Sequence, residues 1–281
     1  MSTQGDLRGA AEKSSETGHL DPDAARSGTP SGRGPRRLQA QVVRRSRLSA
    51  AQRAEMLALM QHCYTGVEPQ RFFADLDAKA HVILLTAARG GRLAGFSTIR
   101  MARATCAGRP VDVLFSGDTV IHPDFWGQKA LQQAFLTFAI GRRLRAPHRP
   151  LYWLLLTKGY RTYLLLTNHF PRAFPRYDAD LRPEERALAG ALAAAWWPDA
   201  WDPTRGVLHF PGGHDRVAVG VAPLEGAVAD NPHVRFFCAA NPGHADGDEL
   251  VCLAELRLRD MARSLARVAR TRLGGRSGHA H

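Results

Sequence analysis

The segment from residue 81 to residue 121 constrains the fold most, because three apolar runs follow one another with only short turns between them. The runs are HVILLTAA, LAGFSTIRMARATC and VDVLFSGDTVI, and the turns are RGGR and AGRP. Gly90 and Gly91 supply the positive φ that a tight hairpin needs. Connections this short join antiparallel neighbours, so the segment predicts three antiparallel strands in one sheet.

Further strands and helices flank these three strands. Before them come a strand in LQAQVVRRS, a helix in AAQRAEMLALMQHCY that Ser49 caps, and a short helix in EPQRFFADLDAKA. After them come a strand end, turn and helix in IHPDFWGQKALQQAF, a buried strand in LYWLLL and a helix in KGYRTYLLLTNHF. This order predicts an α/β (α+β) fold with a mixed, mostly antiparallel central sheet flanked by helices.

The C-terminal third is harder to assign. RPEERALAGALAAAWW predicts a helix that begins near Pro183, and GVLHF and HVRFFCAA predict two strands that complete the sheet. GDELVCLAELRLRDMARSLARVARTRL predicts one long helix, with Asp248 as its cap.

Residues 1–40 differ in composition from the rest of the 281-residue chain. They contain no aromatic residue, Ile or Val, so they cannot bury enough surface to offset the entropy of ordering. We therefore expect a disordered arm over 1–40, a folded domain over 41–255, and a basic amphipathic helix and tail over 256–281.

Composition excludes several classes of protein. No apolar run is long enough to cross a membrane, and the N-terminus lacks the basic-then-apolar pattern of a signal peptide. The four cysteines form no CxxC pair, so we expect neither a disulfide framework nor a zinc site, which fits a reducing cytoplasm. The formal charge of +12 favours an acidic partner: nucleic acid, a membrane surface, a phosphorylated cofactor or an acidic carrier protein.

The order of elements over about 41–180 resembles the GNAT family of N-acyltransferases. In that family a strand ends in an apolar-x-Pro step, and a turn of Arg/Gln-x-x-Gly-x-Gly/Ala type opens a helix whose amides bind the pyrophosphate of acyl-coenzyme A. Ile121, His122 and Pro123 fit the strand end. The resemblance implies transfer of an acyl group from an acyl thioester to an amine.

The turn departs from the family pattern. Trp126 stands at the Arg/Gln position, and Lys129 and Leu131 replace the two glycines. A Cβ there obstructs a close approach of the backbone to a phosphate, although Lys129 adds a positive charge. The resemblance assigns donor binding to five residues: Ile121, Trp126, Gly127, Gln128 and Lys129. An acyl carrier protein, which presents pantetheine without free adenosine diphosphate, is the alternative donor to acyl-coenzyme A.

Acyl transfer needs a base for the amine and an acid for the leaving thiolate. By the resemblance, Asp118 on the strand before the turn is the base, and Tyr163 on the helix after the next strand is the acid. His122 is the reserve base. For Asp118 the alternative is a solvent-facing position beside Gly117. For Tyr163 it is core packing.

Two further features leave alternatives open. The run NPGHADGDELVC gathers possible metal ligands, but its spacing fits neither an EF-hand nor a zinc motif, so no metal site is expected. Arg259, Arg263, Arg267 and Arg270 form one stripe of the last helix. This stripe keeps a second function open, that of a non-catalytic GNAT-like protein whose basic surface binds an acidic partner, a membrane surface or nucleic acid. No aromatic residues interleave with the arginines, which argues against nucleic acid. The acceptor is a small-molecule amine whose identity the sequence does not give.

Overall fold

The computed structural model describes five stretches of the chain: 37–64, 66–88, 90–179, 183–210 and 230–274. Within them the strands are β1 (Leu38–Arg44), β2 (His81–Ala87), β3 (Leu93–Cys106), β4 (Arg109–Ile121), β5 (Leu151–Thr157), β6 (Ala173–Phe174), β7 (Trp201–Asp202), β8 (Val207–Leu208) and β9 (Glu249–Glu255). The helices are α1 (Ala50–Cys63), α2 (Pro69–Asp77), α3 (Ala130–Arg145), α4 (Tyr160–His169), α5 (Pro183–Trp196), α6 (Pro232–Ala240) and α7 (Leu258–Gly274). Three short 3-10 helices are η2 (Arg45–Arg47), η3 (Pro123–Phe125) and η5 (Pro242–Asp246).

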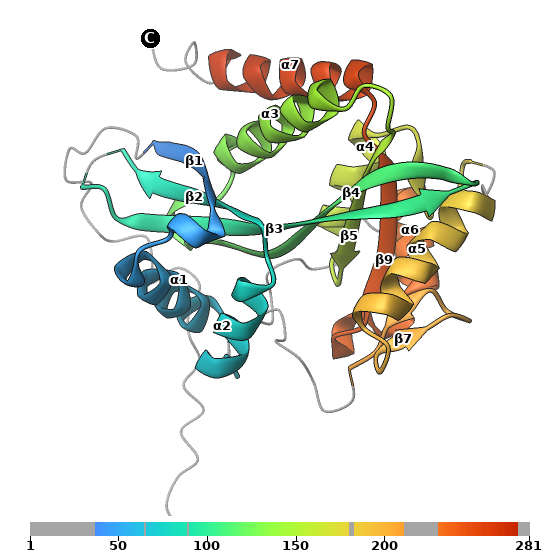
Figure 1. Cartoon of the computed structure of the whole chain (residues 1–281), viewed down its shortest axis with the longest axis horizontal. Helices are drawn as coiled ribbons and strands as arrows, with labels where there is room; N and C mark the ends of the chain where they lie inside the picture. The colour runs from blue at the N-terminus through green and yellow to red at the C-terminus, as the bar shows by residue number, and fades with distance from the viewer. Residues whose placement is uncertain (1–36, 65, 89, 180–182, 211–229, 275–281) are drawn as a thin grey trace, which may run out of the picture. The chain divides into compact units, whose positions relative to one another are not determined.

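The described strands form a single mixed sheet (Figure 1). Its order is β1-β2-β3-β4-β5-β9-β8-β7, and β6 pairs with β9. Each neighbouring pair from β1 to β4 is antiparallel, β4 and β5 are parallel, and β5 and β9 are antiparallel again. The fold is therefore α/β with a mostly antiparallel sheet, as the sequence predicts, and its order from β1 to α4 is that of the GNAT resemblance.

Helices cover both faces of the sheet (Figure 1). On one face α3, α4, α6 and α7 enclose the largest apolar cluster, which contains Leu114 and Trp153. On the other face α1 and α2 pack on β2, β3 and β4, and α5 packs further along on β3 and β9. Val120 of β4 belongs to the apolar cluster under α1 and α2, and Phe115 belongs to the apolar cluster under α5. Strand β4 therefore contributes to both clusters.

The predicted cap of α1 is confirmed at residue level. Ser49 accepts a hydrogen bond from the backbone N–H of Gln52, whose side chain in turn accepts from the backbone N–H of Ser49, so a capping box starts α1. The four cysteines are free in the structure. Within the described residues, no helix has the length and apolar content that a membrane span requires.

Two elements in the C-terminal third differ from the prediction. HVRFFCAA lies in helix α6, because Asn231 caps it, Pro232 starts it, and Val234 and Phe237 bury one helical face. The predicted long helix is instead strand β9 followed by α7, and Asp248 precedes a strand rather than capping a helix. A short apolar run is compatible with either a helix or a strand. The segment of β9 forms a strand because it pairs with β5 and β8.

Burial shows where the described fold begins and which face of its last helix packs on the core. Leu38 is buried and pairs with Ala87 in β1, so residues 38–40 belong to the sheet and the predicted boundary of the arm at 40 is wrong. The rest of the predicted arm, residues 1–36, lies outside the described residues. In α7, Met261 and Val268 are buried, while Arg259 and Arg263 are exposed on the other side, as the stripe predicts.

Candidate active site

The parallel strands β4 and β5 pair over only part of their length. The pairing runs from Asp112 opposite Leu151 to Ser116 opposite Leu155, while β4 continues to Ile121. The indole N–H of Trp153 donates to the hydroxyl of Ser116 at 2.8 Å and so ties the strands together near the last pair. The end of β4 is therefore left without β5 as a neighbour.

A β-bulge interrupts β4 directly after its last pair with β5. Ile99 lies opposite Ser116, but Ser97 lies opposite Thr119, so Gly117 and Asp118 together face the single residue Thr98 of β3. A bulge bends its strand and redirects side chains, and bulges are frequent beside active sites.

The bulge brings Asp118 next to two charged residues from the end of α2. Asp118 is hydrogen-bonded to Asp75 and also lies within electrostatic range of Lys79. The ammonium of Lys79 is buried, with 6% of the side chain exposed, and contacts both carboxylate oxygens of Asp75 at 2.7 Å. We call Asp75, Lys79 and Asp118 the acidic cluster, since two carboxyl groups share one ammonium.

The surroundings of Asp118 raise its pKa from the usual 3.8 to about 7. Burial contributes most, because it disfavours the charged carboxylate, and the charge of Asp75 adds to it. Lys79 acts in the opposite direction and lowers the pKa of Asp118, but less strongly than these two effects together. A base with a pKa near neutrality is deprotonated often enough to act and still binds a proton strongly.

The acidic cluster lies on the face of the sheet that α1, α2 and α5 cover. It lies between the part of β4 that packs on α1 and α2 and the part that packs on α5. A Cβ at Gly117 would meet Thr98 Oγ1 at 2.6 Å and Lys79 Nζ at 3.2 Å, so glycine is what lets Lys79 approach β4. The Lys79 ammonium also lies 5.4 Å from the ring centroid of Phe115. Thr98 Oγ1 is buried and has no hydrogen-bond partner within the described residues, so a donor-bearing ligand has an acceptor there.

Aromatic rings continue this surface on the α5 side. Phe115 contacts the rings of Trp196 and Trp197, with centroids 5.7 and 5.2 Å apart. The guanidinium of Arg100 lies 4.1 Å over the ring of Trp196. Trp196 and Trp197 are thus linked to Lys79 through Phe115.

The structure does not bring Tyr163 to this site. Tyr163 is fully buried and its hydroxyl donates to the carbonyl of Pro175 at 3.0 Å. Its ring packs on Phe236 and Phe237 of α6. Burial also raises the pKa of Tyr163, which makes its proton harder to release. Tyr163 is thus a packing residue, and its assignment as the acid is not retained. The hydroxyl of the neighbouring Tyr160, in the first turn of α4, makes no hydrogen bond within the described residues.

His122 serves the turn after β4. Its Nδ1 accepts a hydrogen bond from the backbone N–H of Asp124 at 3.3 Å, and so caps η3. Its ring stacks on that of His62 in α1, with centroids 5.3 Å apart. Its contacts are therefore with the turn and α1 rather than with the acidic cluster.

The turn residues assigned to donor binding have mixed roles. The carbonyl of Ile121 accepts from the indole N–H of Trp126 at 2.8 Å, which holds the exposed Trp126 against the strand end. Gly127 has φ +81°, and a Cβ built on it would meet nothing within 4 Å. Glycine is needed there for its backbone conformation, not for space.

The two residues that follow lead into α3. The side chain of Gln128 accepts a hydrogen bond from the backbone N–H of Leu38 at 3.0 Å and so anchors β1. Lys129 is the N-cap residue of α3, and its side chain does not bind the first N–H groups of the helix. The positive charge of Lys129 helps to lower the pKa of His169 in α4, after burial and the charge of Arg267. A glycine turn, a helix N-terminus and nearby cations are together suited to a phosphate group.

The NPGHADGDELVC segment is structural. Asp248 is buried, and its carboxylate contacts Arg205 at 2.9 Å and His209 at 2.6 Å. Asn241 donates to its backbone carbonyl at 2.8 Å. Among the described residues, no group of three or more His, Cys, Asp or Glu side chains could hold a metal ion.

The GNAT resemblance points to Asp118 but to neither Asp75 nor Lys79. The one signal for them is their spacing of four residues at the end of α2, which also suits an ordinary surface ion pair. Only the tertiary packing of α2 against the bulge gives this pair a role.

No family model matches the sequence, and no curated protein matches it. Solved structures of acyltransferases match part of the chain. A probable N-acyltransferase from Enterococcus faecalis is 13% identical, with a TM-score of 0.36; the match covers 46% of this chain and 32% of that one. ElaA from Escherichia coli is 18% identical, with a TM-score of 0.34 and coverages of 51% and 94%.

A third structure is the GNAT family N-acetyltransferase YhbS from Escherichia coli, which was solved in complex with CoA. It is 12% identical, with a TM-score of 0.32, and the match covers 47% of this chain and 73% of that one. These likenesses extend over about half of the chain.

Proposed function

We propose that this chain is an N-acyltransferase that moves an acyl group from an acyl thioester to an amine, with Asp118 as the general base. The observation that carries the proposal is the carboxyl of Asp118, which lies in the bulge of β4 where β5 ceases to pair and has a pKa of about 7. A buried carboxyl raised to this range is typical of groups that exchange protons in catalysis.

The reaction follows from the protons that must move. An amine attacks the thioester carbonyl only when it is neutral, so a proton has to leave the ammonium before or during attack. The carboxylate of Asp118 takes that proton. The adjacent Asp75 carboxylate raises the pKa of Asp118 and so favours the protonated product, while Lys79 holds Asp75 in place at 2.7 Å.

The leaving thiolate needs a proton from an acid. Of the two tyrosines of α4, Tyr163 is bound to Pro175, whereas the Tyr160 hydroxyl makes no hydrogen bond within the described residues. Tyr160 opens α4 immediately beyond β5, the strand that parts from β4. We therefore propose Tyr160 as the acid that protonates the leaving thiolate. Tyr160→Phe should lower kcat about tenfold or more and leave donor affinity unchanged.

The donor is acyl-coenzyme A or an acylated carrier protein. The N–H groups at the start of α3 and the charge of Lys129 suit a phosphate of either donor. The acceptor is a small amine. Phe115, Trp196 and Trp197 give the surroundings of Lys79 an apolar side, which favours an acceptor or acyl chain with apolar surface.

Thiol release tests the proposal directly. The full chain is mixed with acyl-coenzyme A of several chain lengths, or with an acylated carrier protein, and with pooled amines. We expect thiol release that depends on an amine, and a loss of at least about 100-fold in Asp118→Asn. Absence of release with every donor would contradict the enzyme and favour the non-catalytic binding protein.

The pH profile separates a base from a merely structural carboxyl. Because the charge of Asp75 and its hydrogen bond both raise the pKa of Asp118, Asp75→Asn should move the acid limb of kcat/KM to lower pH. The matched control is Asp77→Asn, on the same helix, where the carboxylate pairs instead with Arg53. Equal profiles in the two variants would exclude Asp118 as the titrating base.

A further inference from the structure

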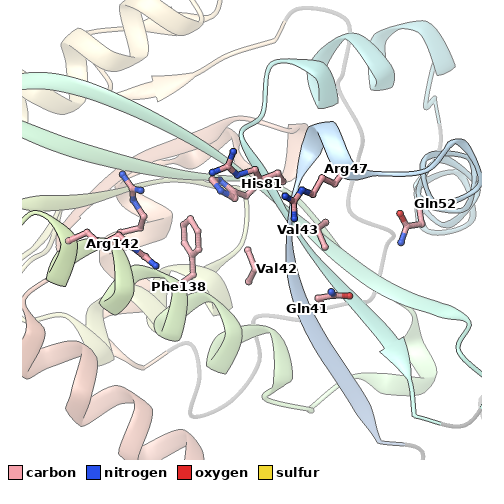
Figure 2. Close-up of a pocket in the computed structure, with 10 residues that line it drawn as sticks. Gln41, Val42, Val43, Arg47, Gln52, His81, Phe138 and Arg142 are labelled. Carbon is pink, nitrogen blue, oxygen red and sulfur yellow. The ribbon is translucent and has the colours of Figure 1, made fainter.

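A second polar site lies at the β1 edge of the sheet, where the C-terminal half of α3 passes β1. It is an open groove of about 810 Å³ lined by residues of β1, η2, β2 and α3 and by one residue of α1 (Figure 2). Four arginines project from its rim: Arg44, Arg47, Arg142 and Arg145. We call it the basic groove.

Among the residues that the structure describes, no carboxylate pairs with the arginines of the basic groove. None of the residues that line it is Asp or Glu. Within the described part of the chain, none of the four arginines forms an ion pair, whereas the adjacent Arg45 pairs with Asp77 at 3.5 Å. Four positive charges around one groove repel each other, and an anion bound between them removes that repulsion.

An aromatic pair forms part of the lining between the arginines. The ring of His81 packs on Phe138 with centroids 5.0 Å apart, and Val42 and Val43 line the groove beside it (Figure 2). His81 Nδ1 and Arg142 Nε are buried without a hydrogen-bond partner in the described residues. Burial first, and then the charges of Arg142 and Arg44, lower the pKa of His81, which shows the positive field that these arginines create.

The basic groove is separate from the proposed active site. Lys79 and His81 are two residues apart, but Lys79 contacts Asp75 near β4, whereas His81 contacts Phe138 of α3. Arg142 is also twelve residues beyond the first residue of α3, a rise of about 18 Å along the helix. A ligand in the basic groove is thus distinct from the amine at Asp118 and from a phosphate at the start of α3.

Arginines near the C-terminus of a helix also stabilise its dipole. That effect accounts for Arg142 and Arg145 in the last turns of α3. It does not account for Arg44 and Arg47, which come from β1 and η2 and lie at the same groove. Cations from separate elements that converge on one concavity indicate recognition of an anion.

We propose that the basic groove binds a small organic polyphosphate of the size of a nucleoside triphosphate. Guanidinium groups bind phosphate oxygens in a bidentate manner, and four of them match an anion with several charges. The volume lies in the upper part of the usual range for small-molecule sites, about 300–1,000 Å³, so a single phosphate would fill little of it. The apolar surface of Val42, Val43 and Phe138 offers contact to the organic part.

Calorimetric titration of the full chain tests this proposal, with ATP as the probe and AMP, orthophosphate and a single-stranded oligonucleotide as comparisons. The variants are Arg44→Gln and Arg142→Gln, singly and together, and Arg145→Gln at an exposed position where folding is not at risk. The control is Arg109→Gln, an exposed arginine at the start of β4 that removes the same charge outside the groove. Thermal unfolding confirms that each variant folds.

We expect ATP to bind, AMP and orthophosphate to bind at least about tenfold more weakly, and each groove variant to lose about tenfold in ATP affinity, with the double variant losing more. Arg109→Gln should stay within about twofold of the parent. Binding of coenzyme A should be unchanged in the groove variants, since its expected site is at the other end of α3. Equal ATP affinity in all variants, or no binding at millimolar ATP, would overturn the proposal. Tighter binding of the oligonucleotide than of ATP, lost in the same variants, would also overturn it and identify a nucleic-acid site.

Discussion

The raised pKa of Asp118 makes the stability of this protein depend on pH in a way that a single substitution should reveal. A carboxyl with a raised pKa binds a proton more tightly in the folded chain than in the unfolded one. Between pH 4 and 7 the folded state therefore holds more protons, and stability falls as the pH rises through this window. Asn at this position cannot ionise, so Asp118→Asn should lack that loss.

The size of the effect follows from the two pKa values. A shift from 3.8 to about 7, at about 1.4 kcal/mol for each pH unit between them, corresponds to about 4 kcal/mol of folding free energy. Roughly 2–3 kcal/mol of this falls between pH 5 and pH 8. On going from pH 5 to pH 8, Asp118→Asn should therefore gain about that much unfolding free energy relative to the parent. The substitution can also change stability by an amount that is the same at every pH, and this does not affect the comparison.

Urea unfolding at pH 5, 6, 7 and 8 measures this difference, provided that the slope of the free energy against urea is the same in both proteins. The control is Asp199→Asn, which removes an exposed carboxyl outside the acidic cluster and should follow the parent at every pH. A free-energy difference between Asp118→Asn and the parent that stays constant from pH 5 to 8 would refute the raised pKa. So would a variant that loses stability relative to the parent as the pH rises.

Three further outcomes are expected. Lys129→Ala should weaken donor affinity several-fold with little change in kcat, because it removes a charge at the start of α3; equal KM for the donor would place this side chain elsewhere. Gln128→Ala should cost about 1–2 kcal/mol of stability, since it leaves the backbone N–H of Leu38 unpaired, and it should not alter donor binding; a change in donor affinity at unchanged stability would reverse that role. Tyr163→Phe should also lower the unfolding free energy by about 1–2 kcal/mol through loss of the bond to Pro175, with kcat unaffected; a tenfold loss of kcat at full stability would restore it as the acid.

The local features of this chain are determined by the sequence. Short turns at RGGR and AGRP leave β2, β3 and β4 no alternative to antiparallel pairing. Ser49 and Gln52 start α1 through bonds only three residues apart. The place of Asp118 on the strand before the turn is likewise local, although its role as the base comes only from the GNAT resemblance. These features depend on neighbours in the chain, so their physical causes are present in a short segment.

The tertiary structure decides what depends on distant neighbours. The run ELVCLAE is a strand because β5 and β8 pair with it, and Tyr163 is a core residue because α6 packs over it. The pKa of Asp118 depends on Asp75, which is far away in sequence and reaches it only because α2 packs against the bulge. The basic groove is assembled in the same way from arginines of β1, η2 and α3. Electrostatic and packing energies depend on distances in space, and the sequence alone does not contain those distances.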